Sequence, residues 1–147
     1  MAANDLNDFR RRMTICGKKI ERNASTLVRR VALAADQAVV FGTPVDTGRA
    51  RSNWIVAINS APEAVIEPYT PGEGGSTGAR NAQAAIDQGS QVIAGYQSGD
   101  EIHITNNLPY IQRLNDGYSD QAPANFVETA VALAAQEVQF YSIVDDD

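Results

Sequence analysis

The chain has 147 residues, of which 44% are hydrophobic and 20% charged, and its net charge is −6. This length and composition fit a single globular domain, residues 1–147, with one modest core, and they argue against wholesale disorder. No apolar run approaches the roughly 18 to 20 residues that cross a bilayer, and the only cysteine, Cys16, cannot form an internal disulfide. We therefore expect no membrane association, and synthesis in a cytoplasm.

The charge is divided unevenly along the chain. Residues 1–41 carry eight basic and four acidic side chains, whereas residues 42–147 carry four basic and fourteen acidic ones. Such a chain can pair its own ends, or pair the N-terminal region of one subunit with the body of a neighbour. Basic residues on one helix face can also bind nucleic acid, which is the competing interpretation.

Asn4 to Phe41 is predicted to form one long amphipathic helix within the segment 1–41, ended by Gly42. Apolar or small residues recur every three or four positions and so share one face. Cys16 lies in this stripe and is expected to be a small buried hydrophobe. The stripe contains Leu6, Phe9, Met13, Cys16, Ile20, Ala24, Leu27, Val31, Ala34, Ala38 and Phe41. The other side carries Arg10, Arg11, Arg12, Lys18, Lys19, Arg22, Arg29 and Arg30.

A rigid turn follows in the segment TPVDTGRARSNWIV, residues 43–56. Pro44 fixes its own φ, and the side chain of Asp46 can accept a hydrogen bond from the backbone that follows it. Arg49 and Arg51 are then expected to project from a defined place. Each can bind a carboxylate of a neighbouring subunit through two parallel hydrogen bonds.

The remaining elements are short. Trp54 belongs to a strand predicted from Ser52 to Asn59, where it is equally compatible with the core and with an interface. Residues 60–80 contain three prolines and four glycines and are expected to form a long flexible loop, with a short extended piece at Ala64–Glu67. A helix is predicted at Asn81–Gln97, and its inner side is expected to carry Ala82, Ala85, Ile86, Ile93 and Tyr96. The other predictions are a strand at Glu101–Thr105, a short helix at Tyr110–Asn115 and a last helix from Pro123 to about Ile143.

The last helix is predicted to be apolar over much of its girth. One row contains Val127, Val131, Ala134, Val138 and Tyr141, and the other Phe126, Ala130, Leu133 and Phe140. A helix of this kind is expected to be sandwiched between layers or between subunits. The final residues, 145–147, are three aspartates that are expected to form a solvated acidic tail.

Residue chemistry does not favour an enzyme. The single histidine, His103, lies on a predicted strand, and no nucleophile motif such as G-x-S-x-G accompanies it. A chain with one histidine and one cysteine comes close to excluding a zinc site. The loop GEGGSTGAR lacks the lysine of a phosphate-binding loop. We expect no catalytic residue, no metal and no cofactor.

Two segments carry a resemblance to a known family. TPVDTGRARSNW (residues 43–54) and NNLPYIQRLNDGYSDQAPANFV (residues 106–127) resemble the signature stretches of the tail-completion, or head–tail joining, proteins of tailed bacteriophages, the HK97 gp10-like neck proteins. In that family a long N-terminal helix leads to a P-x-D-T-G turn, and a strand ending in Asn-Asn leads to a Pro-Tyr helix. The chain departs from it at Leu114–Gly117, where many relatives carry an acidic E-x-G, and in the length of the excursion at 69–80.

The resemblance implies an α+β fold with a small antiparallel β-sheet flanked by the long N-terminal helix, a middle helix and a C-terminal helix. It also implies a homo-oligomeric ring, commonly a hexamer, in the virion neck. There the ring contacts neighbouring connector and tail-tube or tail-terminator proteins and leaves an axial path for DNA without reading its sequence. The side chains expected at subunit or partner interfaces are Asp46, Arg49, Arg51, Trp54, Tyr110, Arg113 and Asp116.

Two other functions compete with a structural virion protein. One is a nucleic-acid-binding accessory protein that uses the basic face of the N-terminal helix. The other is a tail assembly factor that is absent from the finished particle.

Overall fold

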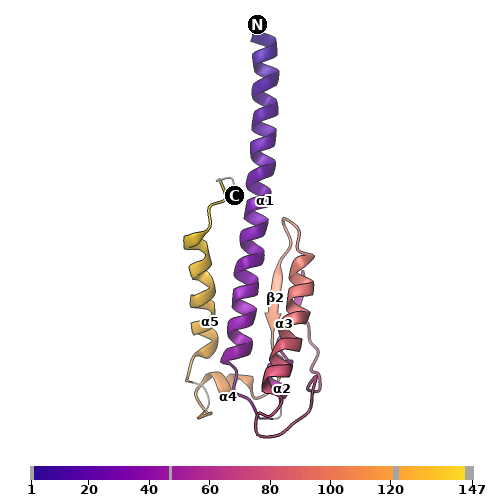
Figure 1. The fold of residues 1–147 in the computed structure, drawn as a ribbon, viewed down its shortest axis with the longest axis vertical. Coiled ribbons are helices and arrows are strands. Elements are labelled where there is room, and N and C mark those ends of the chain that lie inside the picture. The colour runs from indigo at the N-terminus through magenta and orange to yellow at the C-terminus, as the bar shows by residue number, and fades with distance from the viewer. Residues whose placement is uncertain (1, 47, 121–122, 145–147) are drawn as a thin grey trace.

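A computed structural model describes residues 2–46, 48–120 and 123–144, with side chains from Asp5 onward. The fold is α+β, as expected from the resemblance. Helix α1 (Ala2–Gly42) runs the length of the molecule. It is flanked on one side by α5 (Phe126–Ala135) and on the other by α3 (Gly78–Ala94) and the sheet (Figure 1).

The short elements join these helices. Strands β1 (Ile55–Ile58) and β2 (Ile102–Thr105) pair antiparallel, with Ile55 opposite Thr105 and Ile58 opposite Ile102. The one-turn helix α2 (Arg49–Ser52) precedes β1, and α4 (Ile111–Asn115) follows β2. A 3₁₀ segment, η1 (Gln136–Phe140), continues α5.

The core lies where the C-terminal half of α1 meets α3, α5 and β1. Small residues on α3 bring its backbone close to α1, since a Cβ added at Gly89 would lie 2.2 Å from Oδ2 of Asp36. The predicted inner face of this helix is confirmed, because Ala82, Ala85, Ile86, Ile93 and Tyr96 are buried. The central cluster consists of Val39, Val40, Trp54, Ala82, Ala85, Ile86, Phe126 and Ala130.

Element boundaries differ from the prediction where local hydrogen bonds favour a helical turn. The first strand begins at Ile55 rather than Ser52, because the amides of Ser52 and Asn53 bond the carbonyls of Gly48 and Arg49. The segment 64–67 is not a strand. Its backbone bonds a side chain instead, since the amide of Ile66 donates to Oδ1 of Asn53 and Nδ2 of Asn53 donates to the Ile66 carbonyl.

The last helix is shorter than predicted and is covered on one side only. It begins at Phe126 and gives way to η1 after Ala135. Phe126, Ala130 and Ala134 are buried, whereas Val131 and Leu133 are exposed. A complete sandwich is therefore not formed within one chain. The acidic tail at 145–147 lies outside the described residues.

The N-terminal part of α1 is not covered by the rest of the chain. It projects beyond every other element (Figure 1), and Leu6, Phe9 and Met13 are 52%, 59% and 57% exposed. The prediction that Cys16 is buried is wrong, because the thiol is exposed. The first half of the predicted stripe thus has no partner within the described chain. In the second half the prediction is partly wrong, because the buried residues are Asp36, Val39 and Val40, which the stripe did not contain, and Phe41 is 58% exposed.

Candidate functional site

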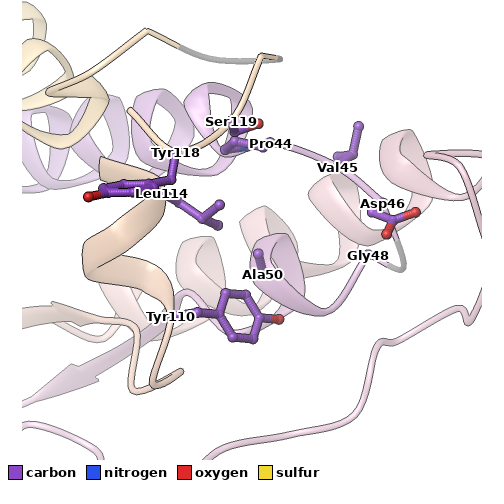
Figure 2. A pocket seen from close by; sticks show the side chains of 9 residues that line it. All are labelled: Pro44, Val45, Asp46, Gly48, Ala50, Tyr110, Leu114, Tyr118 and Ser119. Carbon is purple, nitrogen blue, oxygen red and sulfur yellow. The ribbon is translucent and has the colours of Figure 1, made fainter. Parts of the chain in front are cut away.

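The turn after α1 and the segment around α4 enclose a pocket at the end of the molecule opposite the N-terminus (Figures 1 and 2). Its volume is about 350 Å³. Ala50, Tyr110 and Leu114 lie around the same open space in Figure 2. The full lining is Pro44, Val45, Asp46, Gly48, Ala50, Tyr110, Leu114, Tyr118 and Ser119.

Arg51 holds this turn from inside the subunit. Its Nε donates to the carbonyl of Thr43 at 3.1 Å, and its two terminal nitrogens donate to the carbonyls of Gly78 and Phe41 at 3.3 and 3.2 Å. Burial lowers the pKa of this guanidinium. Arg51 does not project freely as expected, because three backbone carbonyls of its own chain accept bonds from three of its five N–H donors. A contact between its remaining donors and a neighbour stays a prediction.

Asp46 fastens the turn to the long loop. Its Oδ1 accepts a hydrogen bond from the amide of Gly74 at 3.1 Å, and its carbonyl accepts one from the amide of Gly75 at 2.8 Å. These bonds join Asp46 to a segment that lies far along the chain, a partnership that the sequence did not predict. Gly48 has a φ of +85°, and a Cβ there would lie 2.0 Å from Nδ2 of Asn81, so this position requires glycine.

A buried asparagine organises the loop on the other side of the turn. The side chain of Asn81 accepts bonds from the Ser52 hydroxyl and the Thr70 amide, and it donates to the carbonyls of Thr70 and Thr77. The loop at 60–80 is thus held by side chains of the body rather than hanging free, contrary to the expectation of a flexible loop. Asn81 was missed from the sequence, where a polar residue near a helix start looks like an ordinary solvent-facing position.

Arg49 and Tyr110 lie together beside a second pocket, which is lined by Arg49, Glu67, Pro68, Pro71, Gly72, Glu73 and Tyr110. Arg49 lies 3.8 Å from Glu67, and both side chains are well exposed, so this ion pair contributes little to stability. Burial raises the pKa of Tyr110, an effect that the nearby charge of Arg49 opposes. Arg49 and Tyr110 remain candidates for a partner contact.

The other expected interface residues are divided between core and surface. Trp54 is 6% exposed and donates from Nε1 to the Thr43 hydroxyl at 2.7 Å, so it is a core residue of the single chain. Arg113 is exposed on α4. Asp116 is exposed at the C-terminal end of α4. The structure brings Asp46 and Tyr110 to one pocket and places Arg113 and Asp116 on the neighbouring surface.

The single histidine and the acidic residues are not gathered into one cluster in the described chain. His103 contacts Glu101 across 3.4 Å on the sheet and lines neither pocket described above. Within the ranges that the structure describes, no three of His, Cys, Asp and Glu gather to hold a metal ion. In the same ranges, no helix combines the length and the apolar character that a bilayer crossing demands.

Comparison with known proteins adds no assignment. No family model, no curated protein and no solved structure matches the chain.

Proposed function

We propose that the chain is a structural virion protein of a bacteriophage neck or tail, which forms a homo-oligomeric ring. The ring completes the tail or joins it to the head, and DNA passes along its axis without base-specific contacts. Its neighbours are connector proteins on one side and tail-tube or tail-terminator proteins on the other.

The observation that carries this proposal is the convergence of the two segments that resemble neck proteins. Residues 43–54 and 106–127 are far apart in the sequence, yet both line the pocket in Figure 2. Nδ2 of Asn106 donates to the carbonyl of Ala50 at 2.9 Å, which joins the segments directly. Trp54 and Phe126, one from each segment, share the core cluster. Two motifs that build one surface are more specific than two unrelated matches.

Exposed apolar side chains support self-assembly independently of the resemblance. They occur on the projecting part of α1 and on the outer side of α5 and η1, where Phe140 is 82% exposed. Large uncovered apolar surfaces of this kind mark protein–protein contacts.

The proposal is tested in particles made by the phage or prophage that encodes the chain. We expect mass spectrometry of purified virions to find the chain at a fixed multiple of the portal subunit, and electron microscopy to place it in the neck. Its absence from finished virions that still need it for assembly would instead identify a tail assembly factor.

Nucleic-acid binding is the second candidate, because Arg10, Arg11, Arg12, Lys18 and Arg22 are all exposed on α1. Asp8 already pairs with Arg11 at 2.8 Å and with Arg12 at 2.7 Å, which reduces the free positive charge. A salt-dependent mobility shift of duplex DNA would favour this function. We expect no shift at low ionic strength.

A further inference from the structure

We infer that the N-terminal arm of one copy, defined as residues 2–17, packs into an apolar groove on the body of a second copy. The inference rests on the proposed self-assembly and names the two surfaces that make it. The arm supplies an apolar seam with Leu6, Phe9 and Met13 exposed along it. The groove lies on the C-terminal half of the same helix in the neighbouring molecule.

The groove is built from three elements of the body and has a volume of about 410 Å³. Its floor is α1, and its sides are β2 and η1. Nearly all of its lining is aliphatic: Leu27, Val28, Val31, Ala32, Ala35, Ile102, Ile104 and Val138. An apolar groove between packed elements is the form of site that receives an amphipathic helix.

The arm has the pattern that such a groove binds. Leu6, Phe9, Met13, Cys16 and Ile20 are spaced by three and four residues in strict alternation, which is the seam of a helix that packs on another along its length. The side chains from Asp5 to Gly17 are exposed, apart from the half-buried Asp8. Further along α1, Nδ2 of Asn23 donates a hydrogen bond to the carbonyl of Ile143 and so joins the helix to the C-terminal segment.

The arm cannot fill the groove of its own chain. Helix α1 is continuous from Ala2 to Gly42, so the arm extends away from the body along the same axis that forms the groove floor (Figure 1). No proline occurs within it to allow a reversal. The occupant must come from another molecule.

Charge favours the groove, rather than a second arm, as the surface to which the arm binds. The positions that flank the seam are Asp5, Arg10, Arg12, Gly17 and Lys19, so two arms packed together would bring mostly positive residues into contact. The C-terminal segment that forms one side of the groove has the opposite character. Residues 114–147 contain no lysine or arginine, and Glu137 lies next to Val138 of the lining. Opposite charges beside matching apolar surfaces favour arm against body.

An arm that enters a neighbour's groove makes a head-to-tail contact. Each molecule then offers an arm to one neighbour and a groove to the other, which is the kind of interface that closes into rings. This geometry permits a test in which two variants that cannot assemble alone associate when they are mixed.

The arm variant Phe9→Asp and the groove variant Val138→Asp change exposed side chains, so neither should disturb folding. We expect each variant to be monomeric by native mass spectrometry, and an equimolar mixture to form a one-to-one heterodimer. In that heterodimer the intact arm of the Val138→Asp chain occupies the intact groove of the Phe9→Asp chain. No further chain can add, because the arm and the groove that remain free are the two substituted ones. Val65→Asp makes the same change at an exposed valine that lines neither the groove nor the pockets described above, and it should assemble like the unchanged chain.

The outcomes separate this inference from the proposed function. Rings that survive both substitutions would overturn the arm-and-groove contact while leaving a neck ring intact. A Val138→Asp variant that still dimerises alone, without help from a mixture, would show arm-to-arm pairing and would also overturn it. An unchanged chain that stays monomeric at every concentration would overturn the contact, and the virion analysis described above would then decide the function separately.

Discussion

Asp36 lies near the C-terminal end of α1 with its side chain fully buried, and neither carboxyl oxygen has a hydrogen-bond partner in the described chain. It faces the backbone of α3 at Gly89. Burial raises the pKa of Asp36 from 3.8 to about 7, because a charged carboxylate loses its hydration in this position. The protonated acid is thus the form that the fold accommodates.

This burial predicts that stability falls as pH rises from about 4 to about 7. The native state retains a proton in that window that the unfolded chain releases, so the stabilisation is complete below pH 3.8 and is lost on passing the folded pKa. Each pKa unit corresponds to about 1.4 kcal/mol, which makes the whole change about 4 kcal/mol. In urea unfolding across this range, the free energy of unfolding of Asp36→Asn should rise relative to that of the unchanged chain as pH increases.

Asp120→Asn is the matched control for this measurement, because Asp120 is exposed. It removes one negative charge without touching the core, and so separates the effect of burial from that of net charge. If the difference between Asp36→Asn and the unchanged chain does not vary with pH, the Asp36 carboxyl group is not held in its neutral form.

Arg51 provides a second prediction at this scale. A lysine cannot reach three separate carbonyls as the planar guanidinium does. Arg51→Lys should therefore lower the free energy of unfolding by about 1.5–3 kcal/mol, the range for hydrogen bonds made by charged groups. Arg113→Lys, on the exposed side of α4, should change it little. Equal values for the two variants in chemical denaturation would contradict the role given to Arg51.

At the scale of elements, the loop at 60–80 is held by the asparagines that surround it. Besides the bonds of Asn53 and Asn81, Nδ2 of Asn107 donates to the carbonyl of Pro62 at 2.7 Å. Side chains from three separate parts of the chain thus fix a segment that has no regular structure of its own.

Removing Asn81 should release this loop. We expect Asn81→Ala to increase amide hydrogen exchange and protease cleavage at 62–77, because the Ser52, Thr70 and Thr77 partners lose their bonds together. Gln83→Ala, at an exposed position on α3, serves as the control. Unchanged exchange in Asn81→Ala would show that other contacts hold the loop.

The sequence predicted where the long helices lie better than it predicted what covers them. The 3.6-residue period located α1 within two residues at its start and one at its end, and it identified the buried face of α3. A period cannot tell whether an apolar face is covered by its own chain. For that reason the exposure of Cys16 was misjudged, and the sequence could not say what covers the second apolar face of the last helix. Arg51 was misplaced because its carbonyl partners come from Phe41, Thr43 and Gly78, which only the folded chain brings together.

The arm itself adds little to the stability of the body. Because its side chains contribute nothing to the core, deletion of residues 2–17 should leave the thermal midpoint of the isolated subunit nearly unchanged. Scanning calorimetry of the shortened chain in its monomeric form tests this. A large drop in the midpoint would mean that the arm folds against the body in solution.

At the scale of the whole molecule, the two ends differ in character. One end carries the projecting arm, and the other carries the turn, α2 and α4, where the two family-like segments meet (Figure 1). The exposed outer side of α5 and η1 lies between them. A molecule with a lateral contact surface and a separate end surface can join its own copies sideways and still present one face to a different partner.

Self-assembly is the claim on which the proposed function depends, and native mass spectrometry of the unchanged chain, together with negative-stain images of the same sample, tests it most directly. We expect one closed species of fixed copy number, seen as rings with an open centre. A chain that remains monomeric at every concentration, alone and mixed with the connector and tail proteins encoded beside it, would contradict the claim.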